Sequence, residues 1–147
     1  MKFFSAIVAV AAMAASASAA FSSCGTSSDS LTLGSVSYTP NPPVVNQNIC
    51  VTLSGTLSKP VTTGATISVT ATFFGINVYS NSGDLCAALA GGANPCPIPV
   101  TTTSLTDCIT VPSSVPAGIS INLQATATNA DSSPIFCISG PLTFSSA

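Results

Sequence analysis

Three stretches of the chain alternate apolar and polar side chains one by one, and this pattern constrains the fold more than any other feature. In residues 119–128, Ile, Leu and Ala alternate with Ser, Asn, Gln and Thr, and the same period of two runs through residues 65–73 and 49–54. Such alternation is typical of antiparallel strands that place one face on a core and the other in water. Frequent Thr together with Ile or Val agrees with strands.

Further strands and one short helix complete the prediction. Four less regular segments, separated by turns rich in Pro, Gly, Asn and Ser, are expected to form strands: residues 31–38, 76–79, 104–111 and 135–144. Asp84 is suited to cap a helix over residues 85–90, which Gly91 and Gly92 would end. About seven strands with at most one short helix predict an all-β fold, an immunoglobulin-like two-sheet antiparallel β-sandwich.

The N-terminal segment has the features of a secretory signal peptide. Lys2 precedes an apolar run over residues 3–15, and Ala17-Ser18-Ala19 supplies the small residues of a cleavage site. A membrane anchor is the weaker alternative, because serines dilute the end of the run and polar anchoring flanks are missing. We predict a signal peptide over residues 1–19, cleaved at its end or after Ala20. The protein would then be secreted or enter the lumen of the secretory or vacuolar pathway.

Charged side chains are almost missing from the predicted domain, residues 21–147. The chain contains no His, Glu or Arg, and removal of Lys2 leaves Lys59 as the single cation beside four aspartates. Without a basic patch, no nucleic-acid partner is expected. Without imidazoles or clamping guanidinium groups, we expect no enzymatic activity and no cofactor. The domain is expected to act through its shape and apolar surface.

The aspartates and serines do not suggest a reactive site. Asp84 suits the helix cap, whereas Asp29, Asp107 and Asp131 are scattered and are expected to be solvated. No Asp-rich loop suggests a calcium site, and no G-x-S-x-G motif suggests a serine nucleophile. The cysteines lack C-x-x-C spacing and histidine partners, so no metal site is predicted.

Six cysteines in a secreted domain are typical of a disulfide framework. Fifteen pairings are possible, and the sequence alone does not choose among them. The strand pattern narrows one pairing, because Cys50 and Cys108 both lie on outward faces of their strands. Two such cysteines on neighbouring antiparallel strands would lie roughly 4.5–5.5 Å apart between Cα atoms, which suits a disulfide.

The other cysteines suggest one local and one long-range bridge. Cys86 and Cys96 flank a single loop, and Cys24 and Cys137 would then tie the N-terminal segment to the last strand. A bridge that closes about 100 residues is worth about 4–5 kcal/mol by chain entropy.

Several short motifs follow one another in a distinctive order. They are SYTPNPP at residues 37–43, DLC at 84–86, CPI at 96–98 and VPAG at 115–118. With an early cysteine and a late IFC, this order resembles the ML-domain lipid-recognition family, closest to the fungal phosphatidylglycerol/phosphatidylinositol transfer proteins and related to the Niemann–Pick lysosomal sterol carrier. The resemblance implies a sandwich whose sheets part to admit a lipid, and it implies the bridges Cys24–Cys137 and Cys86–Cys96. Cys50 and Cys108 depart from the family pattern.

The resemblance implies a secreted lipid-binding or transfer protein that holds a phospholipid or a sterol between its sheets. Such a protein would contact membranes transiently, and a monomer is expected. The inward strand faces and residues 73–79, where alternation breaks and a mouth is expected, supply the cavity candidates: Ile67, Val69, Phe73, Phe74, Ile76, Val78, Tyr79, Ile121, Leu123 and Leu142. The alternative is a secreted immunoglobulin-like interaction or cell-surface module with a closed core, because an alternating apolar face is normally plain core.

Overall fold

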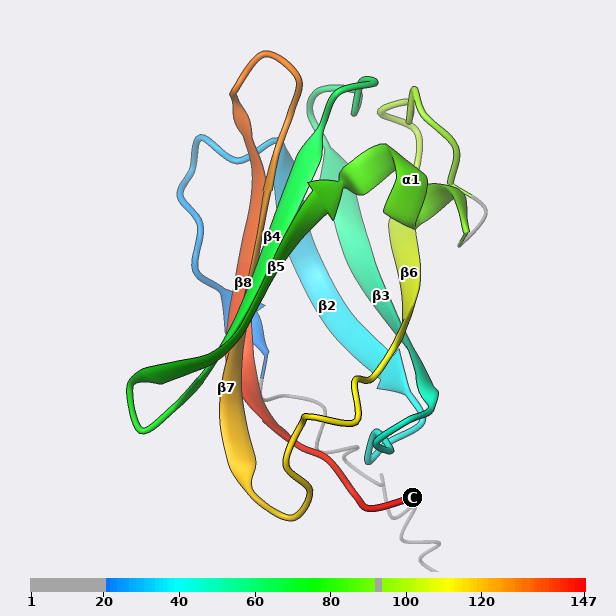
Figure 1. The fold of residues 1–147 in the computed structure, drawn as a ribbon. Helices are drawn as coiled ribbons and strands as arrows, with labels where there is room; N and C mark the ends of the chain where they lie inside the picture. Colours follow the sequence, from blue (N-terminus) through cyan, green and yellow to red (C-terminus); the bar gives the residue numbers. More distant parts are fainter. Residues whose placement is uncertain (1–20, 92–93) are drawn as a thin grey trace, which may run out of the picture.

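Two antiparallel sheets face each other in the computed structural model, which describes residues 21–91 and 94–147 (Figure 1). The five-stranded sheet has the order β1-β8-β7-β4-β5, and the three-stranded sheet has the order β2-β3-β6. The strands are β1 (Ser22–Ser23), β2 (Leu31–Thr39), β3 (Asn48–Leu57), β4 (Thr66–Phe73), β5 (Ile76–Asp84), β6 (Ser104–Thr110), β7 (Ser120–Thr128) and β8 (Pro134–Thr143). The predicted two-sheet β-sandwich is confirmed, with the two-residue β1 as an additional strand beside β8.

The alternating segments form the centre of the larger sheet. β4 and β7 pair with each other, and Ala65, Ala71, Ile121 and Ala127 are buried on their inner side. β5 continues to Asp84, five residues beyond the predicted end at Tyr79. Its second half contains Ser, Asn and Gly and is exposed on both faces, so no apolar alternation marks it in the sequence.

The short helix α1 (Leu85–Ala90) confirms the predicted helix and crosses one end of the sandwich. The Asp84 carboxylate accepts a hydrogen bond of 3.1 Å from the backbone N–H of Ala87, as an N-cap does. Leu85 and Leu89 point inward and are buried. The predicted signal peptide and Gly92 lie outside the described residues. Among the described helices, none is long and apolar enough to cross a membrane.

The buried side chains form two clusters at opposite ends of the strands. The first cluster lies below α1 and includes Leu53, Leu85 and Ile135. The second lies near the C-terminus and includes Ile121 and Phe144. The inner face between these clusters is packed less completely, and this middle layer holds the candidate site.

Candidate functional site

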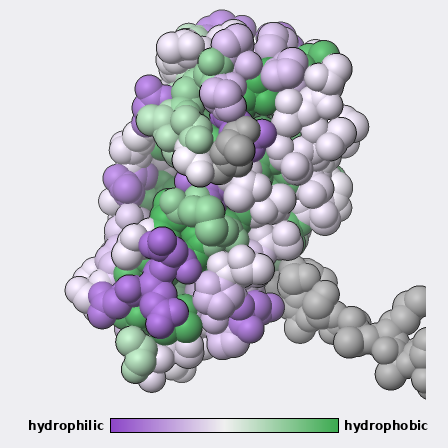
Figure 2. Space-filling view, turned by 90° about the vertical axis from the view of Figure 1, so that its right-hand side faces the viewer, coloured by the Kyte–Doolittle hydropathy of each residue, from purple (hydrophilic) through white to green (hydrophobic). Residues whose placement is uncertain are grey.

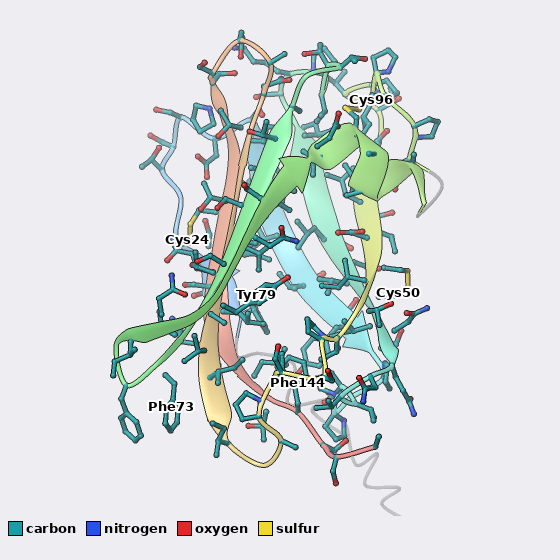
Figure 3. All side chains as sticks on the ribbon, viewed as in Figure 1. Cys24, Cys50, Phe73, Tyr79, Cys96 and Phe144 are labelled. Carbon is teal, nitrogen blue, oxygen red and sulfur yellow. A yellow bond between two sulfur atoms is a disulfide. The ribbon has the colours of Figure 1, made fainter. Side chains whose placement is uncertain are left out.

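An apolar cavity of about 430 Å³ lies between the two sheets. Both sheets contribute side chains to it, as does Phe144 just after β8, and Figure 3 labels Phe144 and Tyr79 of β5. The larger sheet supplies Ile67, Val69, Ala71, Val78, Tyr79, Ile121, Leu123, Ala125, Phe136, Ile138 and Leu142. The smaller sheet supplies Val36, Tyr38, Ile49, Val51, Leu53, Leu105, Asp107 and Ile109. The volume lies within the range of about 300–1,000 Å³ that small-molecule sites occupy.

Side chains in the middle of the inner faces remain partly accessible. Ile67, Val69, Leu123 and Ala125 point inward by register, yet none of them is fully buried. Inward side chains of a sandwich are normally close-packed against the opposite sheet. Their accessibility therefore comes from the space between the sheets that no protein atom fills.

The cavity opens between two edge strands. β5 pairs only with β4, and β6 pairs only with β3, so each is an edge strand of its sheet and they do not pair with each other (Figure 1). Val78 on β5 and Ile109 on β6 line the cavity and are nevertheless 49% and 47% exposed. Val115 and Pro116 of the loop after β6 complete this opening, which we call the mouth. Figure 2 shows apolar side chains gathered between hydrophilic ones on the side of the molecule that carries β6.

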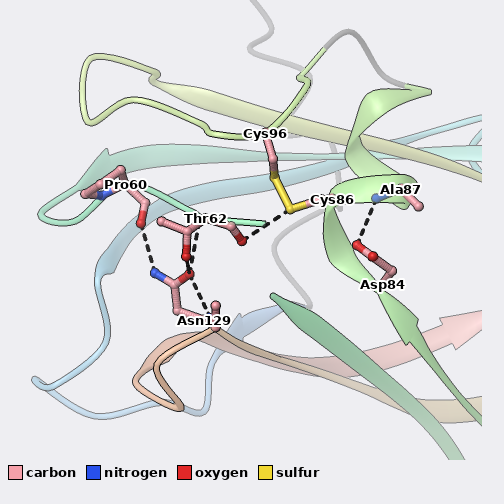
Figure 4. Close-up of a disulfide and its surroundings, with 8 residues drawn as sticks. Pro60, Thr62, Asp84, Cys86, Ala87, Cys96 and Asn129 are labelled. Carbon is pink, nitrogen blue, oxygen red and sulfur yellow. Dashed lines mark hydrogen bonds between the residues drawn. A yellow bond between two sulfur atoms is a disulfide. The ribbon is translucent and has the colours of Figure 1, made fainter. Parts of the chain in front are cut away.

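The end of the cavity near α1 is held closed by covalent and polar links (Figure 4). Leu85 and Leu89 of α1 line the cavity, and the Cys86–Cys96 disulfide ties this helix to the chain that leads into β6. The buried Asn129 side chain accepts hydrogen bonds from the backbone N–H and hydroxyl of Thr62 and donates one to the Pro60 carbonyl, at 2.9–3.0 Å. These bonds fix the loop between β3 and β4 against the turn between β7 and β8.

All three predicted disulfides are present in the structure. Cys24–Cys137 joins the segment after β1 to β8 across 113 residues. Cys50 and Cys108 lie directly opposite each other in the β3–β6 ladder, with Cα atoms 4.0 Å apart. This bridge lies on the outer face of the smaller sheet and fastens the edge strand β6, which forms one side of the mouth.

Asp107 is the one carboxylate in the cavity lining of the described residues, and the prediction that it is solvated was wrong. β6 alternates, so Asp107 shares the inward face with Leu105 and Ile109 and becomes half-buried. Burial raises the pKa of its carboxyl group, although a hydrogen bond from the backbone N–H of Cys108 lowers it in part. The alternation of β6 was the signal that would have placed this residue correctly.

Among the residues that the structure describes, no cation lines the cavity to balance this carboxylate. Lys59, the only Lys or Arg in residues 21–147, lies outside the cavity and pairs with Asp131 at 3.5 Å. Both side chains of this pair are more than half exposed. The described residues also contain no group of three or more His, Cys, Asp or Glu side chains that could hold a metal ion.

Seven of the ten predicted cavity residues line the cavity: Ile67, Val69, Val78, Tyr79, Ile121, Leu123 and Leu142. Phe73, Phe74 and Ile76 do not line it. They belong to the β4–β5 hairpin beyond the cavity, where Phe74 is 89% and Ile76 is 69% exposed. Sequence reasoning missed the wall that the smaller sheet provides, as well as Phe136 and the helix side chains Leu85 and Leu89. For β3 the sequence does contain the signal, because the alternation of residues 49–53 identifies the inner face of this strand.

Comparison with known proteins connects this geometry to a family. The family model of the ML domain matches residues 18–144. The chain is similar to the phosphatidylglycerol/phosphatidylinositol transfer protein of Candida albicans, with 32% identity over 78% of this chain and 59% of the relative. Proteins of the same name from Kluyveromyces lactis and Neurospora crassa are 31% and 28% identical, over 80% and 79% of this chain and 69% and 65% of theirs. The chain thus spans about three fifths to two thirds of the length of these relatives.

Solved structures with the same fold agree with this relationship. A Niemann-Pick type C2 protein from Japanese carpenter ant superposes with a TM-score of 0.64 at 16% identity, covering 84% of this chain and 98% of its own. Chicken MD-1 complexed with lipid IVa superposes with a TM-score of 0.53 at 16% identity, covering 84% and 88%. The family resemblance predicted from the order of the motifs is confirmed.

Proposed function

The chain belongs to the ML-domain family, and we propose that it carries a lipid in the cavity between its two sheets and exchanges it with membranes. The observation that supports this most directly is the apolar cavity of about 430 Å³, which is open at the mouth between β5 and β6. A closed-core interaction module, the alternative, would pack Val69 and Ala125 against the opposite sheet instead of leaving them accessible.

The apolar lining is suited to reversible carriage. Taking a methylene group out of water gains about 0.8 kcal/mol, so an acyl chain or a sterol ring system would be held firmly against loss to water. A bilayer offers the same lipid a similarly apolar surrounding. Transfer between cavity and bilayer is therefore close to balanced in free energy, as a carrier requires.

The charge at the cavity favours a lipid whose head carries no net charge. Names of the curated relatives refer to phosphatidylglycerol and phosphatidylinositol, whose phosphates are anionic. In this chain Asp107 would face such a phosphate, and no described cation of the lining would compensate. A sterol or a phospholipid without net charge fits this lining better, because its hydroxyl or its balanced head does not meet a like charge.

The proposed setting follows from the disulfides and the composition. Three disulfides are typical of secreted proteins or of the lumen of the secretory pathway. We place the protein there as a monomer that acts without catalysis. The proposal includes the predicted signal peptide over residues 1–19, which would direct the chain into this pathway.

Native mass spectrometry of the purified protein tests the function. The expected result is a population whose mass exceeds that of the chain by one lipid, with organic extraction releasing that lipid. Incubation of delipidated protein with a sterol or with phosphatidylcholine should restore the heavier species. Protein that is isolated without lipid and takes up none from sterol- or phospholipid-containing vesicles would contradict the proposal.

A further inference from the structure

The turn between β4 and β5 carries a strained and exposed aromatic residue. Phe74 and Gly75 both have positive φ, at 49° and 76°, so they occupy the central positions of a two-residue type I′ turn. This turn favours Asn-Gly, and positive φ is unfavourable for a bulky residue such as Phe. The Phe74 side chain is 89% exposed, so it gains little from packing that would offset this strain.

The end of this hairpin is apolar and uncharged. Ile76 is 69% exposed, and the Phe73 ring supports Phe74 with ring centroids 4.4 Å apart. Between Lys59 and Asp84 the sequence contains no charged residue. Figures 1 and 3 show the hairpin extending beyond the body of the sandwich, with Phe73 near its end. We call Phe74 and Ile76 the hairpin tip.

A β-bulge connects the hairpin tip with the mouth of the cavity. Ala71 pairs with Tyr79 and Thr72 pairs with Asn77, which leaves Val78 as the additional residue of β5. Val78 is half exposed and lines the cavity, two residues along β5 from Ile76, so the tip and the mouth share this strand.

The shape of the tip favours a lipid surface over a protein partner. Stable protein interfaces bury about 800 Å² on each partner and need complementary shapes, which a two-residue turn does not offer. A fluid bilayer needs no complementary shape, and aromatic and aliphatic side chains on a peripheral protein insert into its interfacial region. The lack of basic residues near the tip removes the attraction that would select an anionic membrane.

We propose that the hairpin tip inserts Phe74 and Ile76 into the interfacial layer of a bilayer without net charge, and so brings the mouth of the cavity to the membrane. This inference rests on the proposed lipid exchange and names the surface through which it occurs. It also explains why a strained phenylalanine occupies a position at which asparagine would suit the fold.

The substitution Phe74→Asn tests the tip without endangering the fold. Because Asn-Gly is the preferred type I′ pair, F74N should unfold at the same temperature as the unmodified protein or at a higher one. Flotation with phosphatidylcholine vesicles should show a loss of vesicle binding of roughly tenfold or more. Native mass spectrometry should show an unchanged lipid content. The matched control is Val100→Asn, which removes a 47% exposed apolar side chain elsewhere and should leave vesicle binding unchanged.

Two outcomes would overturn the inference. One is vesicle binding by F74N equal to that of the unmodified protein. The other is concentration-dependent self-association in light scattering that F74N abolishes, because the tip would then cover a second copy of the chain. Failure of the proposed function is recognised separately, since the unmodified protein would then contain no lipid regardless of whether it binds vesicles through the tip.

Discussion

Asp107 lies directly opposite Val51 in the β3–β6 ladder, so its carboxylate shares a face with an apolar wall of the cavity. The carboxylate is half-buried on an edge strand, beside the mouth. A ligand head that stops at this position would meet a negative charge in a partly desolvated place. The pair therefore links the strand register to the choice of lipid.

Replacing Asp107 by Asn is expected to broaden ligand choice toward anionic lipids. At an effective dielectric constant near 20, like charges several ångströms apart repel by a few kcal/mol, and exposure at the mouth reduces this to about tenfold in affinity. D107N should take up phosphatidylglycerol roughly tenfold better, with sterol uptake little changed, in a vesicle-to-protein transfer assay. Asp29→Asn changes the net charge equally outside the cavity and serves as the control. An equal gain in phosphatidylglycerol uptake in both variants would show that the overall charge of the protein, and not the position of Asp107, determines the choice of lipid.

The pH dependence of folding stability should reveal the burial of the Asp107 carboxyl group. Because the pKa of Asp107 is raised by burial, the charged form disfavours the folded state above that pKa, and the penalty disappears as the pH falls through it. D107N should therefore be more stable than the unmodified protein at pH 7, and the difference should shrink on acidification. Hydrogen bonds donated by Ser133 lower the pKa of Asp131, so the charged form of Asp131 favours the folded state. This contribution is the same in both proteins and cancels in the comparison. Urea unfolding at several pH values measures this, and a constant difference would refute it.

The alternation of side chains was sufficient to predict the sandwich but not the cavity. Ala65, just before β4, and Val69, within β4, have the same phase of the alternation. Ala65 is nevertheless fully buried, whereas Val69 faces the open space of the cavity. Ala65 packs in the cluster that contains Leu85 and Leu89 of α1, whereas the space beside Val69 is the cavity. A period of two identifies the face on which a residue lies but not what packs against that face.

Two other differences have local causes. The charged side chain of Asp107 predicts exposure, but its place in the alternation of β6 puts it on the inward face. The break in alternation over residues 73–79 predicts that Phe74 and Ile76 line the mouth, but they lie at the turn between β4 and β5, outside the cavity lining. A Phe-Gly pair does not predict a type I′ hairpin, whereas an Asn-Gly pair does.

The Cys50–Cys108 bridge should stabilise the edge strand at the mouth. It closes a 58-residue separation, for which chain entropy gives about 4 kcal/mol, against about 3 kcal/mol for Cys86–Cys96 with a separation of 10. The double substitution C50A/C108A should lower the free energy of unfolding by about that amount in urea titrations. Hydrogen exchange should also accelerate in β6 more than in β7. A smaller loss than that of C86A/C96A would contradict this account.

Asn129 is expected to be essential to the closed end of the cavity. Its side chain is buried and bonds the Thr62 N–H, the Thr62 hydroxyl and the Pro60 carbonyl, so Asn129→Ala removes three hydrogen bonds that fix the loop between β3 and β4. We expect a loss of about 1–2 kcal/mol in the free energy of unfolding by urea, because Thr62 and Pro60 are exposed and water can replace part of these bonds. The exposed Asn122 on β7 provides the control, because N122A should change stability by less than about 0.5 kcal/mol.

Filling the cavity distinguishes a lipid site from a closed core. Ala125 on β7 lies opposite Val69 and Ile138, lines the cavity and is only partly buried. In Ala125→Phe the ring should occupy the space that a lipid would use. Native mass spectrometry should then find no bound lipid, while the thermal stability of the lipid-free protein stays equal or rises, as cavity-filling substitutions often achieve.

The matched control lies two residues further along the same face. Ala127 is fully buried in the cluster below α1, so Ala127→Phe should overpack and lose about 1–3 kcal/mol or more of stability. If A125F is destabilised as strongly as A127F, the space at Ala125 is ordinary core, and the proposed lipid cavity is wrong. If A125F is stable and free of lipid while the unmodified protein carries one, the cavity between the sheets is the binding site.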